Sequence, residues 1–304
     1  MDIVRFRAMN TGILLAAEGQ GIGRGLREAR QFIESGEQRF SRFRPESELS
    51  ALNRSAGHWV DVSDDLLDLL QLSLDLWRAT DSLFDPSILP DLKRAGYDRS
   101  MDEVRARRDH PAASPASTRI TKPALNELEL DSARSRVRPP LGMELDLGGI
   151  AKGWIAERAA FLLSRYSDSC AVNAGGDMFF IGHPSDADEW TVDVEDPRDP
   201  ASMLSALTVA SGGVATSSVR KRAWTQGGQS RHHLIDPRTG QSARTDWLSV
   251  TVTAPRLTSA DVFAKVLLIG GTDAIHLLPP DVLFLAVNSA GQLTGTLDPI
   301  GVPQ

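Results

Sequence analysis

The chain has 304 residues, of which 41% are hydrophobic and 24% are charged, as in an ordinary globular protein of one large or two modest domains. Its 33 basic and 40 acidic side chains give a net charge of −7, and no basic stripe stands out, which argues against nucleic acid as a partner. The single cysteine, Cys170, excludes an intrachain disulfide and a cysteine-based zinc site.

The N-terminus has no charged region followed by an apolar run, as a secretory signal would require. The apolar stretch Gly12–Ala17 is too short to span a membrane, and no transmembrane segment is expected. A cytoplasmic protein is the simplest expectation. An exported protein whose leader is absent from this sequence would look the same.

The first half of the chain is predicted to contain strands, two long helices and a surface insertion. Ser63 is the expected N-cap of the second helix, and Pro86 holds Asp85 extended in a turn. The Arg-, Ala-, Ser- and Pro-rich segment is expected to be a flexible surface insertion, above all within 111–117. The predicted elements are a strand pair within Asp2–Ala17, helices Ile22–Phe40 and Asp64–Thr80, a turn at Leu83–Ser87, the insertion at about 99–123, and a hairpin of Glu127–Leu130 and Ser135–Arg138.

The stretch Glu144–Arg158 is predicted to form a strand, a glycine turn and a helix. Leu145 and Leu147 alternate with acidic residues, Gly148-Gly149 allows a sharp turn, and the apolar period then becomes helical. Lys152 lies in the first turn of this helix, where amides, the helix dipole and an ammonium group would favour a phosphate. Taken alone, the stretch favours an ordinary turn and a solvated lysine over a phosphate site, because it matches neither the Walker A loop nor the dinucleotide fingerprint.

The rest of the chain is predicted to hold a cluster of strands and one further helix. Thr258 or Ser259 is the expected cap of this helix, which should end at Gly270-Gly271. Because the strands are clustered and do not alternate regularly with helices, the expected fold class is α+β, in one domain covering 1–304. The predicted strands are Cys170–Asn173, Met178–Ile181, Trp190–Glu195, Ala206–Ala210, Gly213–Thr216, Leu248–Ala254 and Val282–Val287.

Eight segments, in order along nearly the whole chain, resemble the ApbE family of FAD:protein FMN transferases. Each segment alone is weak evidence of a relationship, but eight segments in the same order as in the family argue against a chance match. They are Met9–Thr11, Phe40–Asn53, Phe84–Pro86, Leu145–Trp154, Val172–Asp177, Val214–Ser217, His233–Gly240 and Ser259–Gly270.

The resemblance implies a single α+β unit of mixed or antiparallel sheet packed with helices. It implies an enzyme that binds FAD with a divalent metal, usually Mg²⁺, moves FMN to a Thr or Ser hydroxyl of a partner flavoprotein, and releases AMP. The acceptor motif associated with the family, Asp-Gly-x-Ser/Thr-Gly-Ala-Thr, does not occur here, so the acceptor would be another chain.

The resemblance also assigns expected roles to individual residues. Lys152 would contact the diphosphate, which is expected to lie between the Gly148–Lys152 turn and the helix start near Asp261. The backbone oxygen of Gly149 and the carboxylate of Asp261 would hold the metal. The residues expected to bind or line the flavin nucleotide are Met9, Phe43, Leu83, Phe84, Asp85, Asp146, Lys152, Trp154, Thr216, Ser217, Leu234 and Ile235.

One position departs from the family pattern. The family often has Asp or Ala, then Thr, three and four residues after the metal-binding aspartate, whereas this chain has Ala264 and Lys265. A protonated lysine does not ligate Mg²⁺; at i,i+4 it could pair with Asp261, or it could neutralise the diphosphate directly. The metal site is therefore expected to be incomplete.

His233 and Lys152 are the expected catalytic residues. His233 would accept the proton of the attacking hydroxyl, since histidine titrates near neutral pH, and neighbouring His232 is the alternative. Two other functions use the same site: hydrolysis of FAD to FMN and AMP, or FAD binding without catalysis. A flavin-dependent oxidoreductase is disfavoured, because neither a nicotinamide fingerprint nor a cysteine pair is present.

Overall fold

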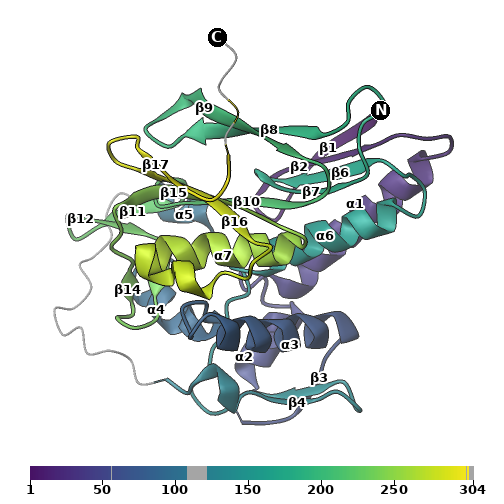
Figure 1. The fold of residues 1–304 in the computed structure, drawn as a ribbon. Coiled ribbons are helices and arrows are strands. Elements are labelled where there is room, and N and C mark those ends of the chain that lie inside the picture. The colour runs from purple at the N-terminus through teal and green to yellow at the C-terminus, as the bar shows by residue number, and fades with distance from the viewer. Residues whose placement is uncertain (56, 108–121, 299, 301–304) are drawn as a thin grey trace. The chain divides into compact units, whose positions relative to one another are not determined.

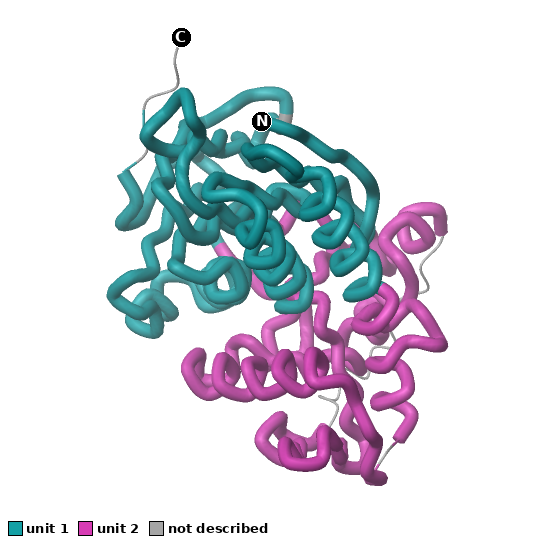
Figure 2. Tube along the Cα trace, turned by 90° about the vertical axis from the view of Figure 1, so that its right-hand side faces the viewer, with its two compact units in different colours: residues 1–37, 150–218, 246–304 teal, residues 38–149, 219–245 magenta. Residues whose placement is uncertain are grey.

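The computed structural model describes residues 1–55, 57–107, 122–298 and 300 (Figure 1). The chain divides into two compact units, coloured separately in Figure 2. Unit 1 comprises residues 1–37, 150–218 and 246–304, and unit 2 comprises residues 38–149 and 219–245. That the whole chain acts as one domain stays a prediction. The expected flexibility of 111–117 concerns residues outside the described ones.

Unit 1 is built on one eight-stranded sheet in which every neighbouring pair is antiparallel. With helices beside antiparallel sheets, the α+β class is confirmed. In the order of the sheet, the strands are β1 (Asp2–Ala8), β2 (Thr11–Ala17), β6 (Cys170–Ala174), β7 (Asp177–Ile181), β10 (Gly212–Ser218), β15 (Trp247–Ala254), β16 (Leu283–Asn288) and β17 (Leu293–Gly295).

The first two strands form the predicted hairpin around Met9 and Asn10. Both residues have positive φ, 54° and 57°, and they lie between the paired residues Ala8 and Thr11. Two central residues with positive φ match the right-handed twist of the flanking strands, and asparagine tolerates this conformation better than most residues. The turn therefore presents Met9 half-buried at the end of the hairpin.

Two layers cover the faces of this sheet (Figure 1). On one face, a β8–β9 hairpin packs alternate apolar side chains, among them Val192 and Val209, against Ala171, Phe180 and Val214 of the sheet. The other face is covered by helices, and Phe32 of the first helix lies with its ring centroid 6.1 Å from that of Trp154. These elements are α1 (Gly23–Phe40, its last three residues in unit 2), α6 (Ala151–Leu163), α7 (Leu257–Gly270), the 3₁₀ helix η3 (Gly271–Leu277), β8 (Trp190–Asp196) and β9 (Asp199–Val209).

The thiol of Cys170 lies in the interior of unit 1 and should be chemically inert. It begins β6 with no exposed surface, and burial raises its pKa to about 12. Because the thiolate is the reactive form, we expect no reaction with an aromatic disulfide reagent at pH 8 in the native protein and full reaction in denaturant. Rapid labelling of the folded protein, followed by absorbance, would contradict this burial.

Unit 2 consists of short elements around a helical core. Its longest helix begins at the predicted cap, where the Ser63 hydroxyl accepts a hydrogen bond from the amide of Leu66. The helices are α2 (Glu48–Arg54), α3 (Asp64–Ala79), η1 (Pro86–Ile88), α4 (Leu89–Arg94), α5 (Met101–Ala106) and η2 (Leu125–Glu127). The strands are β3 (Val60–Asp61), β4 (Glu129–Asp131), β5 (Arg136–Arg138), β11 (Ala223–Gln226), β12 (Gln229–His232), β13 (Ile235–Asp236) and β14 (Gln241–Ser242).

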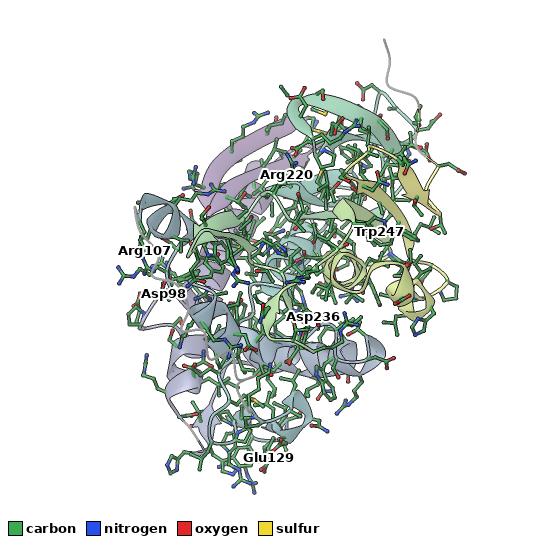
Figure 3. The ribbon with its side chains drawn as sticks, turned by 90° about the vertical axis from the view of Figure 1, so that its left-hand side faces the viewer. Asp98, Arg107, Glu129, Arg220, Asp236 and Trp247 are labelled. Carbon is green, nitrogen blue, oxygen red and sulfur yellow. The ribbon has the colours of Figure 1, made fainter. Side chains whose placement is uncertain are left out.

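Part of the expected insertion is ordered by local contacts. Within 99–107, helix α5 buries Met101 and Val104 and begins with a capping box between Ser100 and Glu103. Asp98 and Arg107, labelled in Figure 3, flank this helix and form an ion pair at 2.9 Å. This segment therefore contains a helix, and the flexible surface insertion expected at about 99–123 stays a prediction.

The predicted strand before the glycine turn is wrong, although its alternating pattern is right. Met143, Leu145 and Leu147 are buried, but the segment joins no sheet. Its backbone instead bonds to the side chain of Asn53, which accepts from the amide of Leu145 (2.8 Å) and donates to its carbonyl oxygen (2.9 Å). Asn53 thus replaces a neighbouring strand and fixes the approach to Gly148.

Replacing Asn53 with leucine should destabilise the protein by about 1–3 kcal/mol, because the half-buried backbone groups of Leu145 would lose both partners. The free energy of unfolding in urea measures this loss. Arg54→Ala, at an exposed position of the same helix, is the control and should change stability by about 0.5 kcal/mol or less. Equal stability of the Asn53→Leu variant and the wild type would show that the two hydrogen bonds between Asn53 and Leu145 do not stabilise the protein.

No described helix is both long and apolar enough to cross a bilayer.

Candidate functional site

The start of α6 holds Lys152 in a fixed position. The N-cap residue, Ile150, makes no side-chain capping bond, so the first turn presents its amides without a side-chain acceptor from the cap. The ammonium group of Lys152 forms an ion pair with the carboxylate of Asp177, the first residue of β7. The other oxygen of Asp177 accepts a hydrogen bond from the amide of Thr216 at 3.2 Å. Lys152 is therefore anchored to the start of β7 and, through Asp177, to β10.

Thr216 and Ser217 lie side by side on β10 but face different surroundings. The hydroxyl of Thr216 lies 2.9 Å from that of Thr251 on the neighbouring strand, so it helps to order the sheet. Ser217 is buried, with 7% of its surface exposed. A role for either residue in binding phosphate stays a prediction.

Gly153 brings α6 and α7 into close contact. A β-carbon built on Gly153 would lie 3.1 Å from the β-carbon of Asp261 and 3.2 Å from the carbonyl oxygen of Leu257. A larger residue here would require the neighbouring atoms to shift by a few tenths of an ångström. The first turn of α6 and the carboxylate of Asp261 are therefore neighbours, and a diphosphate site beside them stays a prediction.

The cap predicted for α7 is wrong, and a buried glutamate explains why. The helix begins at Leu257, and Thr258 lies within its first turn. The carboxylate of Glu157, from α6, accepts hydrogen bonds from the amide (3.1 Å) and hydroxyl (3.2 Å) of Thr258 and pairs with Arg256. This carboxylate already occupies the positive end of the α7 dipole. The start of α6 is therefore the better anion site of the two.

Asp261 and Lys265 form a buried ion pair one turn apart on α7. The ammonium of Lys265 donates to the carboxylate Oδ1 and, at 2.9 Å, to the backbone oxygen of Asp261. A cation therefore already lies against Oδ1 and the backbone oxygen of Asp261, and a second positive charge beside it would be repelled. The residues present do not fit a divalent cation. Gly149, the other expected ligand, is the last residue of the first segment of unit 2, and its role as a metal ligand stays a prediction.

Within the part of the chain that the structure describes, no group of three or more His, Cys, Asp and Glu side chains is arranged to hold a metal ion.

The two remaining expected flavin contacts of unit 1 differ in exposure. Met9 is half-buried in the β1–β2 turn. Trp154 is 1% exposed and packs its ring against Phe32 and beneath the guanidinium of Arg158. Trp154 therefore supports α6 from the interior, while contact of either residue with flavin stays a prediction.

In unit 2, the expected flavin contact Asp146 belongs to a cluster organised by Arg42, a residue that the sequence reasoning did not select. The guanidinium of Arg42 lies 3.2 Å from the carboxylate of Asp146 and donates to the carbonyl oxygen of Tyr97. It also stacks over Phe43, at 4.0 Å from the ring centroid, and over the ring of Tyr97. Arg42 thus fixes two expected site residues, Phe43 and Asp146. The sequence offered one indication of this role, because Arg42 lies between Ser41 and Phe43 in the segment Phe40–Asn53 that resembles the ApbE family.

The Leu83–Asp85 turn is built as predicted. Leu83 and Phe84 are buried, at 7% and 6% exposure. Asp85 accepts hydrogen bonds from the amide and hydroxyl of Ser87 and pairs with Lys122 at 2.7 Å. The carboxylate of Asp85 therefore caps η1, and flavin contacts from these three residues stay predictions.

The two histidines differ in what holds them. His232 ends β12, and its Nε2 lies 3.0 Å from the carbonyl oxygen of Ala243, while its backbone exchanges hydrogen bonds with the hydroxyl of Ser242. Burial lowers the pKa of His232, and the contact with the carbonyl group opposes that shift. His232 thus joins β12 to β14, and the assignment of His233 as the proton acceptor stays a prediction.

The chain after His233 forms a rigid turn. The amide of His233 donates to the carbonyl oxygen of Arg222, and Leu234 and Ile235 are buried at 3% and 1% exposure. Asp236, labelled in Figure 3, accepts from the amide and guanidinium of Arg238, both at 2.9 Å. This turn fixes the backbone on the C-terminal side of His233. Direct contact of Leu234 and Ile235 with flavin stays a prediction.

Comparisons with known proteins agree with these observations. The model of the ApbE family matches residues 9–281. A protein of Treponema pallidum (strain Nichols) named FAD:protein FMN transferase is 32% identical over 268 residues, covering 81% of this chain and 71% of the relative. A protein of the same name from Klebsiella pneumoniae (strain 342) is 31% identical over 231 residues, covering 74% of this chain and 68% of the relative.

The fold is also that of solved relatives. The crystal structure of the ApbE protein from Thermotoga maritima matches this chain with a TM-score of 0.86 and 25% sequence identity, and the match covers 96% of each chain. The match of the family model to most of the sequence and the shared fold lead to one conclusion. This chain belongs to the ApbE family.

Proposed function

We propose that this protein is an FAD:protein FMN transferase, which takes FAD as a substrate and moves FMN to a hydroxyl group of a partner protein. The single observation that carries the proposal is the likeness, over 81% of this chain, to a relative with that name. The anchored lysine at the start of α6 supports it, because amides, helix dipole and ammonium group together suit a diphosphate.

The reaction exchanges one phosphorus–oxygen bond for another. The hydroxyl oxygen of an acceptor Thr or Ser attacks the phosphorus on the FMN side of the diphosphate, and the bond to the AMP phosphate breaks. AMP leaves with the electron pair of that bond, and His233 accepts the hydroxyl proton. Lys152 stabilises the charge that develops on the phosphate oxygens, since phosphoryl transfer depends mainly on positioning and electrostatics.

Magnesium takes no part in this proposal, although the family resemblance implied it. Lys265 pairs with Oδ1 of Asp261 and donates to its backbone oxygen, which places a positive charge at the carboxylate expected to hold the ion. Each step above is assigned to side chains of this protein. A cytoplasmic location, like the Thr or Ser acceptor motif, rests on the sequence reasoning alone and stays a prediction.

The proposal is tested by incubating the full-length protein with FAD and a peptide that carries Asp-Gly-x-Thr-Gly-Ala-Thr. We expect intact-mass spectrometry to show a peptide heavier by one FMN phosphoryl group, and a peptide with alanine at every Thr to remain unmodified. AMP formed equally with and without peptide would instead identify FAD hydrolysis. Retention of FAD without AMP under any condition would identify a binding protein.

A further inference from the structure

The pair formed by Asp261 and Lys265 is the part of unit 1 whose chemistry the proposed reaction does not explain. Only 3% of the Asp261 side chain and 14% of the Lys265 side chain are exposed. Two of the three ammonium donors of Lys265 point to oxygens of the same residue, one from the carboxylate and one from the backbone. A buried carboxylate so close to the turn of Lys152 needs a compensating positive charge.

The oxygens that surround the ammonium are the kind a hard divalent cation selects. Mg²⁺ binds carboxylate and carbonyl oxygens and demands nearly octahedral geometry around itself. Here both kinds of oxygen come from Asp261, and the neighbouring Ala264 offers no side-chain oxygen. The tethered ammonium is present at high local concentration, because its own helix holds it there.

We infer that the ammonium of Lys265 is the resident cation of this site and replaces the divalent metal ion. This inference rests on the proposed function, since it concerns the charge balance of the same transfer reaction. Lys265 balances the negative charge of Asp261 through its contacts to Oδ1 and to the backbone oxygen. The reaction therefore needs no Mg²⁺ at Asp261.

The direct test is metal binding by the full-length protein, which requires no catalytic activity. Mn²⁺ serves as the probe, measured by titration calorimetry and by the loss of free Mn²⁺ in electron paramagnetic resonance. We expect no saturable site in the wild type at up to about 1 mM Mn²⁺. In Lys265→Thr, which supplies a neutral oxygen ligand, we expect a saturable site with a dissociation constant at least about 10-fold below that limit.

Two further variants keep this test decisive. Lys265→Gln also supplies an oxygen and retains a donor toward Asp261, so it serves if Lys265→Thr does not fold. Asp261→Asn combined with either substitution should remove the gained site. Saturable Mn²⁺ binding by the wild type that Asp261→Asn abolishes would overturn the inference, as would folded Lys265 variants that gain no binding.

Activity gives an independent readout. AMP formation from FAD in the presence of the acceptor peptide should be the same within about 2-fold in chelator and in Mg²⁺ for the wild type, but should depend on Mg²⁺ in Lys265→Thr. A wild-type rate of AMP formation that falls by much more than 2-fold in chelator would contradict the inference. If the wild type transfers no FMN in either condition, the proposed function fails, and the Mn²⁺ titration still decides whether Lys265 replaces the metal.

Discussion

Replacing His233 with alanine is expected to lower the rate of FMN transfer by about 10²–10⁴-fold while leaving FAD binding intact, which is the usual effect of removing a general base. The physical reason is that the attacking hydroxyl must lose its proton as the new phosphorus–oxygen bond forms. Single-turnover rates of adduct formation measure the first effect, and quenching of flavin fluorescence on titration measures the second.

The adjacent histidine provides the matched control. His232 holds the carbonyl group of Ala243 and, through its backbone, the hydroxyl of Ser242. His232→Gln should therefore lower the melting temperature. At a temperature where this variant is folded, its transfer rate should stay close to that of the wild type. If His233→Ala transfers FMN as fast as the wild type, or if only His232→Gln loses transfer, His233 is not the base.

The second large effect is expected at Lys152. We propose that its ammonium stabilises the negative charge that develops on the phosphate oxygens, so Lys152→Met should reduce the transfer rate by about 10²–10³-fold, the loss typical of one electrostatic donor. The same substitution removes the partner of Asp177, whose side chain is 5% exposed. An unpaired buried carboxylate should also cost about 3 kcal/mol in the free energy of unfolding.

A double variant separates the two contributions of Lys152. Asp177→Asn removes the negative charge that Lys152→Met leaves without its partner, but keeps an oxygen that can accept a hydrogen bond from the amide of Thr216. Lys152→Met with Asp177→Asn should therefore recover most of the lost stability in urea without recovering transfer. Recovery of both stability and transfer would mean that Lys152 acts only by pairing with Asp177.

The elements with strong periodicity were predictable from the sequence because local rules decide them. Ser63 caps α3, Gly271 ends α7 with φ of 63°, and Met9-Asn10 forms the turn of β1 and β2. In each case the residue type at one position specifies a conformation that few other residues favour. The α+β class followed from the order of these elements.

The errors arose where a distant residue supplies the hydrogen bond. Leu145 alternates like a strand, but Asn53 takes the place of a neighbouring strand. Thr258 has the composition of a cap, but the carboxylate that satisfies its amide belongs to Glu157. Nothing local to these segments specifies such partners, because they are set by the packing of other elements.

One missed element did carry a local signal. The hairpin of β11 and β12 has Gly227 and Gly228 at its turn, both with positive φ. A pair of glycines between two short strands predicts such a hairpin, but the polar composition of the strands concealed it.

The candidate site was also partly predictable from the sequence. The sequence marked Lys152, Asp261 and Lys265, whereas the pairing of Lys152 with Asp177 depends on how the sheet and α6 pack.

The most direct test of the account is to measure AMP and the FMN adduct in one reaction of the wild-type protein with FAD and the acceptor peptide. Chromatography quantifies AMP, and mass spectrometry of the peptide quantifies the adduct. We predict one AMP for each FMN attached to the peptide, with negligible AMP when the peptide is omitted. AMP in large excess over adduct, or no AMP at all, would contradict the assignment of this chain as an FMN transferase.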